Sequence, residues 1–329
     1  FEETIQRGGI GVASSLQAFA AAFAEAQRQL TTGKSAPLSQ SDEIAQTKLP
    51  EVGPRLQDMA QRIHNEFRPA AHAKLLAGIA RLTDYQSEPY ATLYLDRLAS
   101  LNQMAPANDL GDDIVNESAR HLALWMSYED TVRVADLKIR RSRLERVRLE
   151  VKQNEAQQLD INEFLHPRLE EIADTLPTAL GRWLLHTKWA RQLVGRFTQQ
   201  GRIVKTTSLR GYLLLYAVAS LRVTRPYSLR YQIEQERIST WLSSVTGLLK
   251  INEKLALQVI RAQQLVKGYG DTHSRGWRNF QRLMKALPQL QNEPDAATKL
   301  QQLQKIALSD DSEQALLTSL KAQGLLQPS

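Results

Sequence analysis

Apolar residues recur every three or four positions along most of this chain, and this helical period constrains its fold more than any other feature. One such face carries Leu56, Met59, Ile63 and Phe67. No stretch alternates convincingly as a strand does, although Arg202 to Thr207 can hold a short extended piece. We therefore expect an all-α fold, a multi-helix bundle with at most a minor extended segment.

The longest unbroken helical pattern runs from Ile114 to Gln158 without a glycine or proline. A single helix of that length would span roughly 60 to 70 Å at about 1.5 Å per residue. Its second half carries Leu137, Leu144 and Val151 at heptad spacing, so one side can pack against another helix. We predict that this run forms one long central helix or helical arm.

Short polar residues mark helix starts and a linker. Thr206, Thr207 and Ser208 give a helix start rich in Ser and Thr before Leu209, and Ser228 or an adjacent residue starts another helix. Thr32–Leu49 is polar and contains glycine, proline and several serines, which is typical of a linker. We predict a connector over residues 1–48, made of a helix and this linker, and a helical domain over residues 49–329.

Composition excludes several classes of site. With no cysteine, the chain has no disulfide, no thiolate-held iron–sulfur cluster and no cysteine nucleophile. The six histidines are scattered without the short spacing of a zinc site, so we expect no metal. The sequence contains no apolar run of about eighteen residues and no cleavable signal pattern, so we expect no transmembrane segment and a cytoplasmic location.

The net charge of +7 is unevenly spread, because no Asp or Glu occurs from Thr175 to Ile233. Within this acid-free segment we expect four cations to form a basic surface on the outside of the helices: Arg182, Lys188, Arg191 and Arg196. The neighbouring apolar residues are expected to face inward: Leu180, Trp183, Leu184 and Leu193. Such a surface favours an anionic partner.

The densest group of functional residue types lies between Val266 and Phe280. Its members are candidates for an anion or partner site: Gly268, Gly270, Asp271, Thr272, His273, Arg275 and Arg278. The two glycines allow positive φ, and Asp271 or Thr272 can cap the following helix. A capped helix start with free N–H groups, together with cationic or donor side chains from His273, Arg275 and Arg278, suits a phosphate or carboxylate.

A tight helix–helix corner explains the same stretch equally well. In that interpretation Gly268 ends one helix, Asp271 caps the next, and Trp277 and Phe280 enter the core. The glycine spacing matches neither a P-loop nor a dinucleotide fingerprint. The sequence leaves both interpretations open.

Several stretches carry a resemblance to a known family. They are Asp84–Gln86 with Tyr90 and Tyr94, Trp125–Asp130, Val134–Lys138, Lys205–Ser208 ahead of Gly211, Ser228–Tyr231 and Val266–Phe280. Together they resemble the C-terminal helical region of indolepyruvate ferredoxin oxidoreductase, in its beta subunit or fused form, over nearly the whole chain. The resemblance identifies Phe1–Gln27 as the last turn of a preceding domain similar to the gamma part of 2-oxoacid oxidoreductases.

The resemblance implies oxidative decarboxylation of an aryl 2-oxo acid to an acyl-CoA. The whole enzyme would use thiamine diphosphate, magnesium, iron–sulfur clusters and CoA, and would pass electrons to ferredoxin. This chain has no cysteine for a cluster and no Gly-Asp-Gly motif of a thiamine site. We therefore expect no cofactor and no catalytic residue in it, and we expect the isolated chain to be inactive.

We predict an accessory C-terminal domain that assembles subunits or borders the substrate entrance. Its partners would be other domains or subunits of a homo- or hetero-oligomer, with ferredoxin or CoA at the basic surface. The alternative is a basic helical nucleic-acid-binding module, because Trp183, Trp189 and Phe197 interleave with the cations. The core-like spacing of these rings counts against that alternative. A third interpretation is peripheral membrane association through an amphipathic helix near Trp183 to Phe197.

Overall fold

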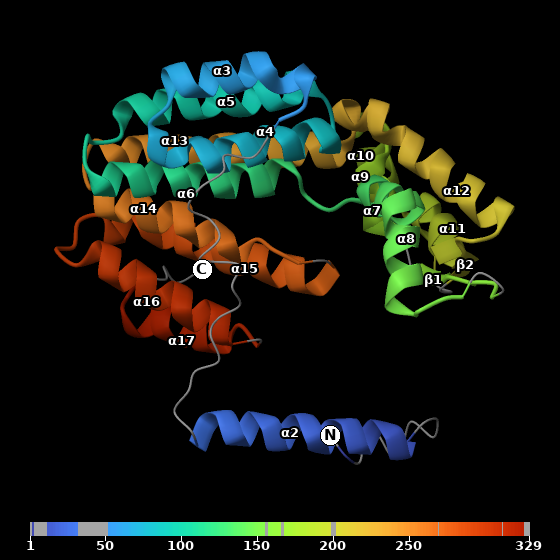
Figure 1. Cartoon of the computed structure of the whole chain (residues 1–329). Helices are drawn as coiled ribbons and strands as arrows, with labels where there is room; N and C mark the ends of the chain where they lie inside the picture. Colours follow the sequence, from blue (N-terminus) through green and yellow to red (C-terminus); the bar gives the residue numbers. More distant parts are fainter. Residues whose placement is uncertain are drawn as a thin grey trace. The chain divides into compact units, whose positions relative to one another are not determined.

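The chain divides into two units, residues 1–51 and residues 52–329, in the computed structural model (Figure 1). The structure describes residues 2, 12–31, 52–154, 157–165, 168–198, 202–268, 270–310 and 312–325. These residues form sixteen α-helices and a two-stranded sheet, which confirms the all-α class. In the first unit, α2 (Val12–Thr31) stacks its Phe19 and Phe23 rings at 6.1 Å. The predicted linker Thr32–Leu49 lies outside the described residues.

The second unit opens with helices that pack on one another. They are α3 (Gln57–Glu66), α4 (His72–Tyr85), α5 (Glu88–Met104) and α6 (Asp109–Met126), with the 3₁₀ turns η2 (Pro54–Leu56) and η3 (Pro69–Ala71) before α3 and α4. The buried Tyr94 hydroxyl ties α5 to α6 by donating to the Ala119 carbonyl at 2.8 Å. Gly78 of α4 makes room for this tyrosine, because a Cβ there would lie 2.6 Å from the Tyr94 hydroxyl oxygen.

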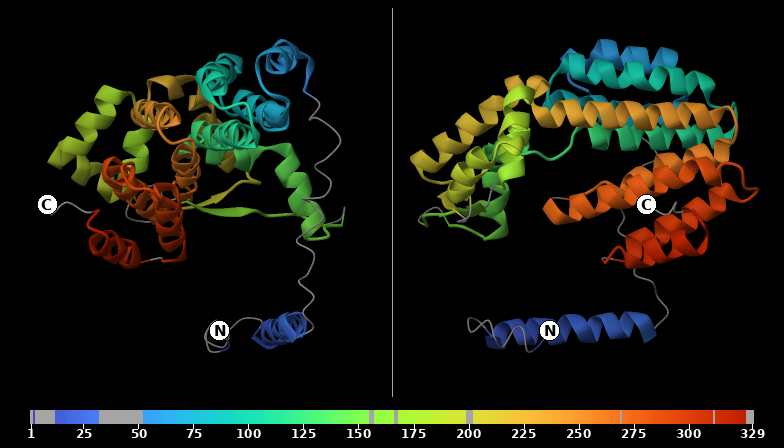
Figure 2. Two further views of the ribbon diagram at one scale, coloured as in Figure 1. Left: turned by 90° about the vertical axis from the view of Figure 1, so that its left-hand side faces the viewer. Right: turned by 180° about the vertical axis from the view of Figure 1, so that it is seen from behind.

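A second group of helices completes the main core. They are α13 (Leu229–Leu249), α14 (Glu253–Ala262), η5 (Gln263–Leu265), α15 (Gly270–Leu290), α16 (Ala296–Ser309) and α17 (Gln314–Ala322). Figures 1 and 2 show α13 beside α5 and α6, with α14 to α17 forming a layer against them. Ser228 accepts a hydrogen bond from the Tyr231 N–H and caps α13, as predicted.

The remaining elements form a lobe at one end of these layers, here called the end lobe (Figure 2). It comprises α7 (Thr131–Ile139), α8 (Arg141–Glu150), β1 (Asn162–Leu165), α9 (Leu169–Thr175), α10 (Thr178–His186), α11 (Lys188–Thr198), β2 (Arg202–Lys205), α12 (Leu209–Ser220) and η4 (Leu221–Tyr227). The predicted extended piece is β2, and its antiparallel partner β1 was not foreseen. Ser208, the last residue of the predicted helix start Thr206–Ser208, caps α12 by accepting a hydrogen bond from the Gly211 N–H.

The predicted long helix over Ile114–Gln158 is wrong. The chain makes α6, α7 and α8 there, and the longest described helices, α13 and α15, have 21 residues each. Asp130 begins a new helix because its side chain accepts a hydrogen bond from the Arg133 N–H at 2.6 Å. Arg140 separates α7 from α8 with an extended backbone, φ −65° and ψ 134°. A polar cap and one extended residue thus divide the run without glycine or proline.

Candidate functional site

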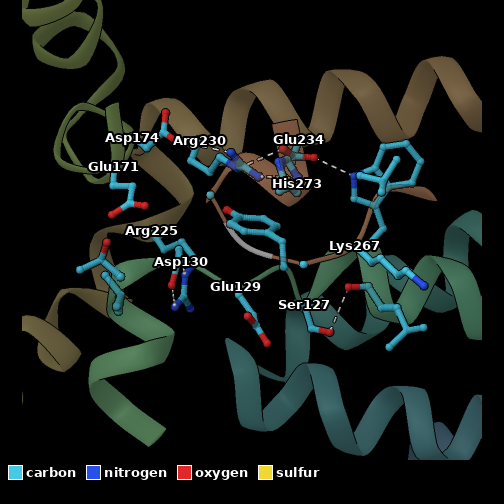
Figure 3. Close-up of a pocket in the computed structure, with 18 of the residues that line it drawn as sticks. Ser127, Glu129, Asp130, Glu171, Asp174, Arg225, Arg230, Glu234, Lys267 and His273 are labelled. Atoms are coloured by element: carbon cyan, nitrogen blue, oxygen red, sulfur yellow. Dashed lines mark hydrogen bonds and ion pairs between the residues drawn. The ribbon is translucent and has the colours of Figure 1, made fainter. Parts of the chain in front are cut away.

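A pocket of about 700 Å³ lies where the end lobe meets the two helical layers (Figure 3). Segments far apart in the sequence line it: the α6–α7 turn, Arg168 with α9, the η4–α13 junction and the η5–α15 turn. Figure 3 shows Arg230, Glu234 and His273 grouped together, with Arg225 and Asp130 paired nearby. The pocket is therefore a product of the tertiary fold.

One wall of the pocket holds a buried ion pair between Arg225 and Asp130. Nε and Nη2 of Arg225 lie 2.7 Å and 3.0 Å from the two carboxylate oxygens, and the side chains are 2% and 10% exposed. Nη1 of Arg225 also donates to the Tyr85 carbonyl at 2.9 Å and to the Gln86 side chain at 2.8 Å. The guanidinium lies 4.1 Å from the centre of the Tyr85 ring. These contacts tie the end of α4 to α7 and η4.

Glu234 is a second buried carboxylate, with a side chain 1% exposed. It accepts hydrogen bonds from Trp125 Nε1 at 2.7 Å and from Arg237 Nη1 at 2.8 Å. Arg230 lies 3.0 Å from the same carboxylate and 3.4 Å from Asp174. Glu234 thus shares its charge between the guanidinium groups of Arg230 and Arg237, which makes this buried charge tolerable. Asp174 is the other carboxylate beside Arg230, and burial raises its pKa above the ordinary value.

His273 lies in the first turn of α15 and completes this cluster. Its Nε2 is 3.2 Å from Nη2 of Arg230, and because a guanidinium only donates, the imidazole nitrogen accepts. Burial, and then the charge of Arg230, lowers the pKa of His273 to about 4. The imidazole is therefore neutral at pH 7, so of the cationic or donor roles that the anion-site hypothesis allows it, the cationic role is absent.

The hydroxyl of Tyr128 is buried against the pocket and has no hydrogen-bond partner among the described residues. The residue is 8% exposed, and its ring centre lies 5.5 Å from the guanidinium carbon of Arg230. Burial raises the pKa of Tyr128 well above its ordinary value, so the phenol keeps its proton. An unpaired buried hydroxyl costs about 1–3 kcal/mol. Tyr128 therefore offers a donor and an acceptor to a molecule in the pocket.

The structure divides the predicted site between Gly268 and Arg278. Gly268 and Gly270 have φ of +84° and +57°, as predicted, and both line the pocket together with His273. Asp271 and Thr272 do not cap the helix, because α15 already begins at Gly270 and both residues lie within its first turn. The helix therefore begins two or three residues earlier than a cap at Asp271 or Thr272 would place it, at a glycine whose backbone is left-handed.

The charged members of that site bind other parts of the protein. Asp271 pairs with Arg168 at 2.7 Å, and Arg278 pairs with Glu313 at 3.1 Å. The first pair is exposed, whereas in the second the Glu313 side chain is only 13% exposed. Arg275 lies farther along α15, near Asp310. The hydrogen bonds that Asp310 accepts lower its pKa, and the charge of Arg275 lowers this pKa further.

The corner interpretation of Val266–Phe280 has direct structural support. Phe280 is 4% exposed in the main core, and the partly buried Trp277 packs against that core. Gly276 lies so close to the Leu265 carbonyl that a Cβ at this position would be 2.0 Å from the carbonyl oxygen. The stretch is thus a tight corner in which Gly268, Gly270 and His273 also face the pocket.

The predicted basic surface lies on α10 and α11. All four of its cations are exposed, and none forms an ion pair within the described part of the chain: Arg182, Lys188, Arg191 and Arg196. These residues therefore keep their charge available to a partner.

The predicted inward direction of the neighbouring apolar residues is mostly wrong. Only Leu184 is buried, whereas three others are about half exposed: Leu180 at 52%, Trp183 at 48% and Leu193 at 50%. Trp189 is 61% exposed, and its ring lies 5.4 Å from that of Trp183. Helices α10 and α11 are short and bury a narrow strip against α9, so their other apolar residues stay uncovered. The side chain of Phe197 lies outside the described residues.

Within the described residues, no helix is long and apolar enough to cross a membrane. In the same part of the chain, no three His, Asp or Glu side chains gather as a metal site.

Residues 71–286, well over half of the chain, match the model of DUF6537, a family of unknown function. The chain belongs to the DUF6537 family. No curated protein and no solved structure matches it. The DUF6537 segment contains every residue that lines the pocket, whereas α16 and α17 lie beyond it. The pocket is therefore built entirely from the part of the chain that defines the family.

Sequence reasoning missed the central residues of this pocket: Trp125, Tyr128, Asp130, Arg225 and Glu234. The first three belong to a stretch that carries the resemblance, but nothing in its spacing indicates burial. One local signal is Asp130, a favoured N-cap residue in the middle of a helical pattern. Arg225 gives no local signal, because its partner Asp130 lies far away in the sequence. Glu234 has Arg230 and Arg237 one turn away on either side, a local ion-pair pattern that sequence reasoning did not use.

Proposed function

We propose that this chain is a helical accessory domain of a 2-oxoacid:ferredoxin oxidoreductase of the indolepyruvate type. In such an enzyme an aryl 2-oxo acid is oxidatively decarboxylated to an acyl-CoA. The domain assembles the subunits or borders the substrate entrance.

The cofactors of that reaction belong to other domains in this proposal. The chain has no cysteine that could hold an iron–sulfur cluster. Its described residues offer no group of His, Asp and Glu that fits a metal ion. No step of the reaction is therefore assigned to residues of this chain.

The observation that carries the proposal is that three of the six stretches of the resemblance meet at one pocket, whereas Val134–Lys138 and Lys205–Ser208 lie elsewhere in the end lobe. Trp125–Asp130, Ser228–Tyr231 and Val266–Phe280 each contribute lining residues. Asp84–Gln86 lies behind them and holds Arg225 through the Tyr85 carbonyl and the Gln86 side chain. These stretches lie far apart in the sequence but close together in the fold. One shared site would therefore account for the fact that all of them resemble the same family.

The test is to tag this chain at its own chromosomal locus and to purify the assembly that it belongs to. We expect reduction of ferredoxin or methyl viologen by indolepyruvate that depends on CoA and thiamine diphosphate. The isolated 329-residue chain is the control and should show no turnover. An assembly that contains no thiamine-dependent enzyme would contradict the proposal.

One observation favours a second candidate, binding of nucleic acid by charge and stacking. Trp183 and Trp189 are exposed beside the unpaired cations of α10 and α11, so their spacing no longer counts against it. Stacking on a ring contributes about 1–3 kcal/mol per base.

This candidate is tested by titrating a fluorescein-labelled single-stranded oligonucleotide at 50 mM and 200 mM salt. It requires quenching of tryptophan fluorescence and a tenfold or greater loss of affinity in Trp189→Ala. An accessory domain should show only weak binding that disappears at the higher salt and is unchanged in Trp189→Ala.

A further inference from the structure

The outer side of α12 is apolar and uncovered within the described residues. It consists of Leu209, Tyr212, Leu213, Leu214 and Tyr216, which are 74%, 39%, 52%, 53% and 55% exposed, and is here called the α12 face. The apolar surface continues into η4, where Val223 and Tyr227 are 77% and 73% exposed. Large exposed apolar patches on folded proteins usually mark interaction sites.

Only one side of α12 is packed against its own chain. Leu215 is buried in a small cluster with Ala135 of α7 and Val204 of β2. Gly211 comes so close to the Lys205 carbonyl that a Cβ there would lie 2.1 Å from its oxygen. A helix that is apolar on all sides is normally buried on all sides. Another surface is therefore needed to cover the α12 face.

The charges around the α12 face indicate the chemistry of that surface. Arg210 lies at the start of α12 and Arg222 just beyond its end, about 18 Å apart at about 1.5 Å per residue. Neither forms an ion pair within the described part of the chain. The Arg222 guanidinium donates a hydrogen bond to the Asp84 carbonyl, and the Arg222 carbonyl accepts one from the Gln86 side chain. The whole segment from Thr175 to Ile233 contributes no carboxylate. A complementary surface carries apolar side chains and carboxylates.

Two other occupants fit less well. A second copy of the chain would bring the same arginines towards each other across a two-fold axis. A helix that lies in a membrane surface has a strongly charged face opposite its apolar face, whereas the opposite side of α12 is packed on α7. Tyr212 and Tyr216 stack at 6.2 Å beside flanking arginines, and Tyr and Arg are enriched in protein interfaces.

We propose that the α12 face docks a protein surface of apolar side chains bordered by carboxylates. This rests on the proposed function in one respect, that the docking surface belongs to the catalytic part of the same oxidoreductase. The α12 face then joins the accessory domain to the enzyme.

The absence of cysteine from this chain allows a direct test. Leu213→Cys places one thiol on the α12 face, and Ile251→Cys places a control thiol at a position that is 69% exposed beyond α13. Each variant is treated with a maleimide, both as the isolated chain and within the native assembly, and labelling of its own peptide is followed by mass spectrometry. We expect labelling at residue 213 to slow at least tenfold in the assembly, and labelling at residue 251 to stay the same. Equal rates at residue 213 would overturn the proposal.

Additional labelling experiments distinguish protein docking from membrane binding and from self-association. Slower labelling of the isolated chain on vesicles of phosphatidylglycerol, without protection in the assembly, would overturn the proposal in favour of a membrane. Slower labelling at higher concentration of the isolated chain would overturn it in favour of self-association. If Leu213→Cys does not fold, Tyr216→Cys gives the same readout. Protection in an assembly that lacks 2-oxo acid activity would refute the proposed function while the docking surface stands.

Discussion

His273 shows how burial decides the role of a single side chain. The sequence places it in a cationic cluster, but Arg230 donates to its Nε2 and the ring stays neutral at pH 7. Its contribution to the pocket is therefore a hydrogen-bond acceptor that holds Arg230, with Glu234 and Arg237 close enough to influence its charge.

This role predicts a dependence of stability on pH. The pKa of His273 is about 4 in the folded protein and ordinarily 6.5, so between these values the unfolded chain binds the proton more readily. The free energy of unfolding should therefore fall by roughly 2 kcal/mol between pH 7 and pH 5 on account of this residue. His273→Gln should lack this decrease in urea denaturation. Asp174 has a raised pKa and acts in the opposite direction in both proteins, so their difference isolates His273. A variant with the parental pH dependence would show that His273 protonates freely when folded.

Tyr128 allows a comparison between an unpaired and a paired buried hydroxyl. Tyr128→Phe should leave the free energy of unfolding unchanged or raise it by up to about 1 kcal/mol, because the lost hydroxyl has no described partner. Tyr94→Phe should lower it by about 1–2 kcal/mol, since its hydroxyl donates to the Ala119 carbonyl. Thermal and urea denaturation measure both variants. Equal destabilisation by the two changes would mean that the Tyr128 hydroxyl is already bonded.

At the scale of elements, glycines set how closely helices cross. Gly276 of α15 lies against the Leu265 carbonyl, whereas a Cβ at Gly247 of α13 would meet nothing within 4 Å. Gly276→Ala should therefore destabilise the protein by about 1–3 kcal/mol, through overpacking against backbone. Gly247→Ala should stabilise it by up to about 1 kcal/mol, through helix propensity. Denaturant midpoints measure both, and a neutral Gly276→Ala would mean that the corner can relax.

The ion pair of Arg225 and Asp130 joins three elements, the end of α4, the start of α7 and η4. Arg225→Ala leaves the Asp130 carboxylate buried without its partner and should lower the free energy of unfolding by about 3–5 kcal/mol. Arg191→Ala on the exposed basic surface is the control, with an expected change under about 0.5 kcal/mol. Similar melting temperatures for the two variants would place Arg225 at the surface in solution.

At the scale of the whole molecule, the basic surface and the α12 face lie in the same acid-free part of the chain. If the proposed function holds, charge reversal at Arg191 and Arg196 should raise the KM of the complete enzyme for CoA or for an acidic electron acceptor. The effect should shrink as salt screens charges over about 8–10 Å. The double reversal Arg148→Glu with Lys254→Glu is a matched control, because both cations are exposed on other helices and neither forms an ion pair within the described residues. Unchanged kinetics at low salt would mean that the basic surface binds neither CoA nor the electron acceptor and only keeps the protein soluble.

The sequence by itself determined the local features of this protein. The all-α class, the helix starts at Ser208 and Ser228 and the positive φ of Gly268 and Gly270 all follow from period, capping and backbone freedom. These properties depend on residues a few positions apart. For the same reason the short extended piece at β2 could be foreseen, but its pairing with β1 could not.

Only the tertiary structure decided which side chains are buried and which of them meet. Trp183 and Leu184 are neighbours in one apolar pattern, yet one is half exposed and the other buried. Arg225 belongs to a basic segment, yet it is buried because Asp130, which lies far away in the sequence, supplies a carboxylate. Burial depends on which surfaces pack together, and that is set by contacts between distant segments. The pocket, its neutral histidine and its unpaired tyrosine are results of those contacts.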